Sequence, residues 1–281
     1  MKKILVCANA DRVEKSELVV EKILAEGFET KVYFPFRSSE NFKYPQFISA
    51  DPEKDAADSN MLVCMGGDGT ILACSKLAAR YGLPILGINY GHKGFIAALE
   101  PNEIELLGGI LHGEYVTENR MMLEAKVIRN GETVFEDFGL NETVIKSAVS
   151  HPVKVKVFGD GVEISAFSGD GIIVATPTGS TAYSLSAGGP IVEPNAENLI
   201  LTPICAHSLN PRTVILRGSR TVNITLGSNV DTILSLDGNT TFRVFPDDVI
   251  EITKSRYVTN LIVGTKRNFY EIVKRKLNTD F

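Results

Sequence analysis

Residues 61–81, MLVCMGGDGTILACSKLAARY, decide the fold of the first part of this chain. The apolar run 62–65 does not alternate with polar residues, which is typical of a strand covered by helices on both faces of a parallel sheet. Residues 70–81 have a helical pattern and end at Gly82. The glycines at 66, 67 and 69 allow a sharp turn between the two. The stretch therefore predicts a strand, a glycine turn and a helix of an α/β domain.

The same alternation extends on both sides of this stretch. Further strands and helices are predicted at residues 3–8, 13–26, 30–34, 84–88 and 101–111. From Arg120 onward the pattern changes to short strand-like segments separated by Gly, Asn or Asp, which favours an antiparallel sandwich. We therefore expect a Rossmann-like α/β domain at 1–118, a β-rich sandwich-like domain at 119–260, and a C-terminal helix in 261–281 that returns to the first domain.

The composition is that of an ordinary globular protein and excludes several classes. The chain has 281 residues, with 29 Lys and Arg against 34 Asp and Glu, so its formal charge is −5. This balance argues against a general nucleic-acid binder, which needs clustered cations to face phosphates. No apolar run approaches the ~20 residues of a membrane span, and the pattern of a secretion signal is missing. We expect a cytoplasmic protein with neither a nucleic-acid nor a membrane partner.

The cysteines give no sign of a special site. Cys7, Cys64, Cys74 and Cys205 show no CxxC spacing. Such spacing is what a zinc site needs, and disulfide frameworks belong to oxidising compartments. The sequence therefore predicts four buried thiols in a reducing compartment.

The glycine turn at residues 66–70 is the first candidate site. Free backbone N–H groups at the start of the following helix favour an anion such as phosphate, so Gly66, Gly67 and Thr70 are candidate phosphate-binding residues. Asp68 would repel phosphate unless it holds a cation or accepts the proton of a hydroxyl nucleophile. The turn thus suggests phosphoryl transfer to an alcohol. The alternative is a tight turn in which Asp68 caps the helix.

Two further segments carry candidate binding groups. Asn141 and Glu142 offer an amide beside a carboxylate, a pair that can bind the vicinal hydroxyls of a ribose, although a polar strand edge would look the same. Residues 168–190 are dense in Gly, Ser and Thr, and Tyr183 could stack on a flat ring. This segment favours a ligand-lining loop over a plain connection. The P-loop pattern, the GxGxxG dinucleotide fingerprint and the GxSxG elbow are absent.

With these motifs in this order, the chain resembles the NAD kinase family over nearly its whole length. The segments that carry the resemblance are 66–70, 87–89 with 94–95, 118–123, 141–142, 170–190, 202–209 and 237–238. Residues 170–190 are the most specific of them, because diacylglycerol and sphingosine kinases and phosphofructokinases are similar at the glycine turn. The resemblance implies transfer of the γ-phosphoryl group of ATP, or in some members of polyphosphate, to the 2′-hydroxyl of the adenosine ribose of NAD. It also implies Mg²⁺ with ATP, NAD in a cleft, and a homodimer or homotetramer.

The resemblance also implies roles for single residues. Asp68 would accept the proton of the 2′-hydroxyl, and Asn141 and Glu142 would hold ribose hydroxyls. The residues implied to contact NAD are Asp68, Gly69, Phe95, Asn141, Glu142, His151, Asp170, Thr181, Ala182, Tyr183, Ser184, Leu185, Ser186 and Asn239. Two positions depart from the family pattern, since Ser168 stands where many bacterial members have Arg and Asn239 where Gln is common. Two alternatives remain open: a lipid kinase that shares only the glycine turn, and a nucleotide-binding regulator without catalysis.

Overall fold

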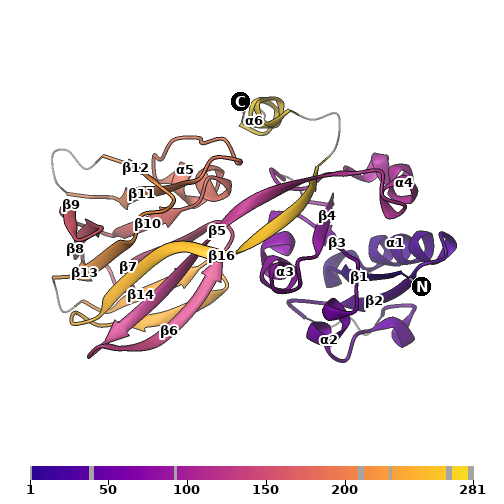
Figure 1. Ribbon diagram of the computed structural model, residues 1–281, viewed down its shortest axis with the longest axis horizontal. Coiled ribbons are helices and arrows are strands. Elements are labelled where there is room, and N and C mark those ends of the chain that lie inside the picture. Colours follow the sequence, from indigo (N-terminus) through magenta and orange to yellow (C-terminus); the bar gives the residue numbers. More distant parts are fainter. Residues whose placement is uncertain are drawn as a thin grey trace. The chain divides into compact units, whose positions relative to one another are not determined.

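The chain folds into two compact units. The computed structural model describes residues 2–37, 41–91, 94–207, 212–227, 230–263 and 268–277. One unit comprises Met1–Asn119 with Thr259–Phe281, and the other comprises Arg120–Val258 (Figure 1). The first unit is an α/β domain with a parallel sheet and the C-terminal helix, and the second is rich in β-strands. The predicted fold class is confirmed.

The first unit is built from strand–helix alternation. Its strands are β1 (Lys3–Cys7), β2 (Glu29–Tyr33), β3 (Met61–Gly66) and β4 (Pro84–Asn89). Its helices are α1 (Val13–Ala25), α2 (Pro52–Ala57), α3 (Asp68–Tyr81), α4 (Leu107–Leu111) and α6 (Phe269–Leu277), with 3-10 turns η1 (Ala10–Arg12), η2 (Pro45–Phe47) and η3 (Pro101–Leu106). The strands lie in the order β2-β1-β3-β4, all parallel, and the end of β16 (Val249–Val263) pairs with β4.

Helices cover both faces of this parallel sheet, as the unbroken apolar strands predict. On β1, Ile4 and Val6 pack on one side with α1 and α4, whereas Leu5 and Cys7 pack on the other side with α2 and α3. Figure 1 shows α1 and α3 on opposite sides of β1 and β3. The expected helix at 101–111 is wrong in its first half, where residues form the 3-10 turn η3. Glu100 and Glu103 close a capping box there, and Gly108 and Gly109 weaken the helix that follows.

The second unit contains two antiparallel sheets. One includes β5 (Val116–Arg129), β6 (Glu132–Gly139), β8 (Val153–Gly159), β9 (Val162–Gly169), β13 (Val222–Leu226) and the first part of β16. The other has the order β12 (Val214–Arg217), β11 (Asn198–Ile204), β10 (Gly171–Ala175), β7 (Glu142–Ser147), β14 (Thr232–Leu236) and β15 (Thr240–Val244). The short turn η4 (Thr178–Thr181) and helix α5 (Tyr183–Ser186) follow β10.

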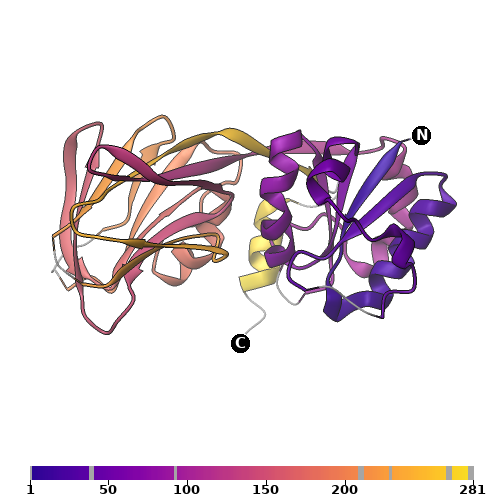
Figure 2. The same ribbon diagram turned by 90° about the horizontal axis from the view of Figure 1, so that it is seen from below.

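The core of the second unit lies between its two sheets. Alternate residues of strands from both sheets point inward, such as Val155 of β8 and Val174 of β10. Figure 2 shows the strands of this unit as two layers, and it shows α6 in yellow with the first unit. No helix among the described residues is long and apolar enough to span a membrane.

Candidate active site

The glycine turn joins β3 directly to α3. Gly67 is the N-cap of α3 and Asp68 is its first residue, but no side chain caps this helix. The alternative in which Asp68 caps its own helix is therefore wrong. A Cβ atom at Gly66 would overlap the side chain of Thr70, so the close approach of strand and helix requires glycine at this position.

Asp68 is instead held by the loop that follows β4. Its Oδ2 accepts a hydrogen bond from the Phe95 N–H at 2.8 Å, and its Oδ1 accepts one from the Ile96 N–H at 3.2 Å. The carboxyl group is partly exposed but surrounded largely by protein, and this burial raises the pKa of Asp68 above its usual value. The two N–H donors and the charge of Lys276 oppose the rise. Asp68 is thus a fixed carboxylate with a raised pKa, as a general base requires.

Lys276 influences Asp68, and no sequence pattern pointed to it. It lies on α6, is buried, and has its Nζ 3.9 Å from Oε1 of Glu100. Arg275 contacts the same oxygen at 3.2 Å, and the Asn89 amide donates to Oε2 of Glu100 at 2.9 Å. This network joins the C-terminal helix to the end of β4 beside the loop that holds Asp68. Lys276 is one of several basic residues in α6, and nothing in the sequence distinguishes it as the one that contacts Glu100.

In the second unit, Asp237 shapes the loop that carries Asn141 and Glu142. The carboxylate of Asp237 accepts hydrogen bonds from the N–H groups of Leu140, Asn141 and Glu142 at 2.7, 2.8 and 3.1 Å. Asp237 itself has a positive φ of 48° in the turn after β14. Three hydrogen bonds to one carboxylate stabilise a single conformation of the loop. The sequence pattern at 237–238 indicated the family resemblance but not this role of Asp237.

Two acceptor atoms in this loop have no partner in the described part of the chain. Oδ1 of Asn141 and Oε2 of Glu142 are buried and lack a hydrogen bond to any described residue. Burial, with the nearby charge of Asp237, raises the pKa of Glu142 to about 8. A buried polar atom without a partner is costly, and such atoms are rare in native proteins. The pair is therefore a place where a ligand's hydroxyl groups would fit.

The hydroxyl-rich segment after β10 lies against the same loop. The Thr176 hydroxyl donates to the Leu140 carbonyl at 2.6 Å and accepts from the Gly179 N–H at 3.1 Å. A Cβ atom at Gly179 would lie 2.5 Å from the carbonyl carbon of Asn141, so only glycine fits. The Thr178 hydroxyl, one residue before Gly179, is a third buried group that makes no hydrogen bond to the described part of the chain. This cluster has three orphaned polar atoms.

Some predicted contact residues are used inside the protein instead. Ser184 is buried, and its hydroxyl shares a hydrogen bond with that of Thr202 at 2.9 Å. The side chain of Thr181 donates to the Thr178 carbonyl at 3.4 Å. Tyr183 and Ser186 are exposed on α5, while Ala182 and Leu185 are half-buried.

The remaining predicted residues lie in two places. Exposed Asn239 ends the turn after Asp237, close in the chain to the Asn141 loop. Asp170 and His151 lie at the opposite end of the β7–β10 ladder, since Gly171 pairs with Lys146 there whereas Ala175 pairs with Glu142. Within the second unit, the structure therefore brings Asn141 and Glu142 together with the 176–186 segment, and it separates Asp170 and His151 from them.

The described residues offer no carboxylate cage for Mg²⁺. The one group of three or more His, Cys, Asp or Glu side chains close enough to share an ion, within the described ranges, consists of cysteines. The donors that Mg²⁺ prefers are oxygens, and it commonly binds through substrate phosphates. A magnesium ion in this chain would therefore depend mainly on the phosphates that it accompanies.

Comparisons with known proteins decide the family. The family models described as the ATP-NAD kinase N-terminal and C-terminal domains match residues 2–115 and 140–263. The chain belongs to the NAD kinase family. The NAD kinase of Caldanaerobacter subterraneus subsp. tengcongensis is 42% identical over 222 residues, which cover 78% of each chain. That of Symbiobacterium thermophilum is 39% identical over 233 residues, or 82% of each chain.

Solved structures of the NAD kinase family agree in fold. The crystal structure of yeast NADH kinase complexed with NADH has a TM-score of 0.83 and 25% identity, and covers 100% of this chain and 88% of that chain. An NAD kinase from Archaeoglobus fulgidus in complex with ATP has a TM-score of 0.74 and 25% identity, and covers 99% and 97%. Family membership identifies the chain as a kinase and sets the lipid-kinase alternative aside.

Proposed function

We propose that this chain is an NAD kinase that transfers the γ-phosphoryl group of ATP to the 2′-hydroxyl of the adenosine ribose of NAD. The observation that carries the proposal is the pair of buried acceptors that have no partner among the described residues, Asn141 Oδ1 and Glu142 Oε2. Ribose hydroxyls are donors that satisfy such acceptors. In a member of the NAD kinase family, the ribose of NAD is the ligand that this pair best supports.

Asp68 is proposed to be the general base. A ribose hydroxyl is a poor nucleophile at neutral pH, and a positioned base contributes roughly 10²–10⁴-fold to such a step. The bonds from Phe95 and Ile96 fix both carboxylate oxygens, so the group does not need to reorganise when it accepts the proton. The proton leaves the 2′-oxygen for Asp68 as that oxygen attacks the γ-phosphorus, and ADP departs.

The phosphates of ATP are proposed to bind at the N-terminus of α3. The N–H groups of Thr70 and Ile71 donate to the Gly67 carbonyl, which leaves those of Asp68 and Gly69 to face a ligand, and the helix dipole favours negative charge there. Gly66 and Gly67 allow close approach of the backbone, and Thr70 begins the buried face of the helix. Mg²⁺ would arrive with ATP and neutralise charge on its phosphates.

The other expectations from the resemblance also stay proposals. Gly69 and Phe95 are proposed beside the ribose and adenine, and Thr181, Ala182, Ser184, Leu185 and Ser186 as the lining of the NAD site. Tyr183 is exposed and could stack on a flat ring. Contacts of Asp170, His151 and Asn239 with NAD, a homodimer or homotetramer, and a cytoplasmic location are proposed in the same way.

A donor-by-acceptor assay tests the function. Purified chain is incubated with ATP and Mg²⁺ or with polyphosphate, and with NAD, NADH or the 2′-deoxyadenosine analogue of NAD. We expect ATP and NAD to give ADP and NADP, with no phosphorylated product from the analogue. ADP release without NADP, or phosphorylation of the analogue, would contradict the proposal.

A further inference from the structure

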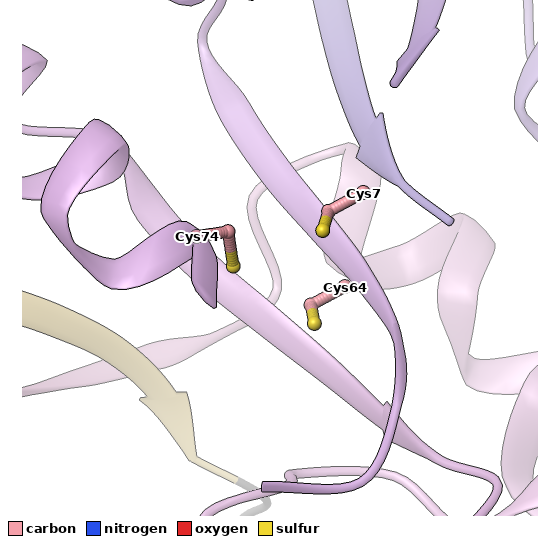
Figure 3. Close-up of side chains that lie close together, drawn as sticks. All are labelled: Cys7, Cys64 and Cys74. Atoms are coloured by element: carbon pink, nitrogen blue, oxygen red, sulfur yellow. The ribbon is translucent and has the colours of Figure 1, made fainter. Parts of the chain in front are cut away.

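Three cysteines that are distant in the sequence meet inside the first unit. Cys7 ends β1, Cys64 lies on β3, and Cys74 lies on α3. Cys7 and Cys64 are register partners on adjacent parallel strands and point to the same face. Figure 3 shows the three side chains close together, where α3 packs on the two strands. Each sulfur atom lies within 4.8 Å of the other two.

This spacing is close to that of a metal site. In a tetrahedral zinc site with Zn–S bonds of about 2.3 Å, two sulfur ligands lie about 3.8 Å apart. The sulfur atoms of Cys7, Cys64 and Cys74 therefore need to move by less than about 1 Å to share one ion. All three are free thiols, and each is 0% exposed. The absence of CxxC spacing had argued against a zinc site, but the register of β1 with β3 and the packing of α3 bring these sulfurs together.

Tyr33 provides a second, independent observation. It is 9% exposed at the end of β2, and its hydroxyl is buried without a hydrogen-bond partner among the described residues. Its hydroxyl lies close to the sulfurs of Cys7 and Cys74 but makes no well-formed hydrogen bond to either of them. A buried O–H group without an acceptor is unfavourable. A metal-bound thiolate would give this donor a strong acceptor.

We propose that Cys7, Cys64 and Cys74 bind a thiophilic d¹⁰ metal ion through three sulfur atoms, with the Tyr33 hydroxyl donating to one of them. Zn²⁺, Cd²⁺ and Cu⁺ share the preference for thiolate that the donor set requires. Hard ions such as Mg²⁺ are excluded because the cluster contains no carboxylate or carbonyl ligand among its three members. The other members of the surrounding cluster are apolar and include Leu5, Leu62, Ile71, Ala78, Leu83 and Ile85.

The ion would tie together the elements that carry the glycine turn. Cys64 precedes Gly66 by two residues on β3, and Cys74 shares α3 with Asp68. Because the sulfurs are fully buried, the ion enters during folding or through a local opening of α3. Bound metal stabilises the folded chain, since the unfolded chain lacks the preformed site. This proposal does not depend on the kinase reaction.

Refolding the full chain with metal tests the site without using activity. The chain is unfolded under reducing conditions, refolded with Cd²⁺, Zn²⁺, Cu⁺ or a chelator alone, and desalted. We expect one ion per chain, a cadmium–thiolate charge-transfer band, and a higher melting temperature than the chelator sample. X-ray absorption of the zinc sample should show three sulfur atoms at about 2.3 Å. A Cu⁺-only result would identify a copper site of the same chemistry.

Matched variants locate the ion. Cys74→Ala should abolish the band and the stabilisation, while Cys205→Ala, which removes an exposed cysteine outside the cluster, should leave both unchanged. Tyr33→Phe should weaken metal affinity by about 10–100-fold. Wild-type chain that binds no metal, or Cys74→Ala that keeps the band, would overturn the proposal. If Cys74→Ala does not fold, the sulfur count in the wild-type spectrum decides, and fewer than three sulfurs rejects the site.

Discussion

Asp68 in the first unit and Glu142 in the second are both partly or fully buried carboxyl groups, but their surroundings differ. Asp68 accepts two backbone hydrogen bonds and has the charge of Lys276 nearby, so donors offset the burial that raises its pKa. Glu142 has an oxygen without any described partner, and the nearby charge of Asp237 adds to its burial. Glu142 is consequently protonated at neutral pH, with a pKa of about 8.

This difference separates two roles. When two carboxyl groups have different surroundings, their pKa values differ, and each group can then take a different acid–base role. Asp68 is held as a carboxylate that can accept a proton. In its neutral form, Glu142 can accept a hydrogen bond from a hydroxyl group at one oxygen and donate a hydrogen bond from the other. This difference supports the proposal that Asp68 transfers the proton and Glu142 binds the ribose, and the following changes test that division.

The largest expected effect comes from Asp68→Asn. The amide keeps the shape of the side chain but cannot act as the base, so kcat should fall by about 10²–10⁴-fold while NAD still binds. Steady-state kinetics and calorimetric NAD binding measure the two effects. Glu142→Gln is the control and resembles the protonated acid already present at neutral pH, so kcat should fall by less than about tenfold. Equal losses of kcat in Asp68→Asn and Glu142→Gln would contradict the proposal that only Asp68 acts as the base.

The next largest effect is a difference between wild type and Glu142→Gln in how the free energy of unfolding depends on pH. The folded pKa of Glu142, about 8, lies above the ordinary value of 4.5, so the folded chain binds more protons than the unfolded chain between these values. This contribution to stability is present below about pH 4.5 and is lost as the pH rises through about 8. Wild type should lose roughly 5 kcal/mol more than Glu142→Gln across this window. Urea unfolding at a series of pH values checks it, and parallel curves would disprove the buried, unpaired state of Glu142.

A smaller effect is expected from Gly179→Ala. The added methyl group would overlap the backbone of Asn141, which should cost about 1–3 kcal/mol of stability and weaken NAD binding. Gly69→Ala is the matched control for stability, because a Cβ atom there meets no atom within 4 Å. Unfolding free energies of both variants give the comparison. A Gly179→Ala chain as stable as wild type would show that the segment does not pack on the Asn141 loop in this way.

The smallest effect is expected from Lys276→Met. Removing the charge that lowers the pKa of Asp68 should raise that pKa, so the acid limb of kcat/KM moves to higher pH. The loss at neutral pH should be about fivefold or less. Lys274→Met changes an exposed lysine of the same helix and should leave the pH profile in place. An unshifted pH profile for Lys276→Met would show that the charge of Lys276 on α6 does not affect the pKa of Asp68.

The sequence predicted the elements and the turn because those depend on local patterns. The apolar run 62–65 and the glycines at 66, 67 and 69 are enough to place Asp68 in a turn before a helix, although α3 begins at Asp68 and not at the predicted residue 70. The contacts that define its chemistry are not local. The donors Phe95 and Ile96 come from the loop after β4, and Lys276 comes from the end of the chain.

The same distinction holds for the other polar groups. The sequence indicated Asn141 and Glu142 as a binding pair but could not show that their oxygens are buried without partners. The prediction of four buried thiols is wrong for Cys205, which is exposed at a residue with a positive φ of 44° after β11. For Cys7 and Cys64, only the register of β1 with β3 reveals that they are neighbours.

The most direct test of the central claim is a crystal structure of the full chain with NAD. The account predicts the 2′-oxygen of the adenosine ribose about 2.6–3.2 Å from the Asp68 carboxylate, with ribose hydroxyls donating to Asn141 Oδ1 and Glu142 Oε2. An ordered ribose elsewhere, with its 2′-oxygen beyond reach of Asp68 and both acceptors still without partners, would contradict it.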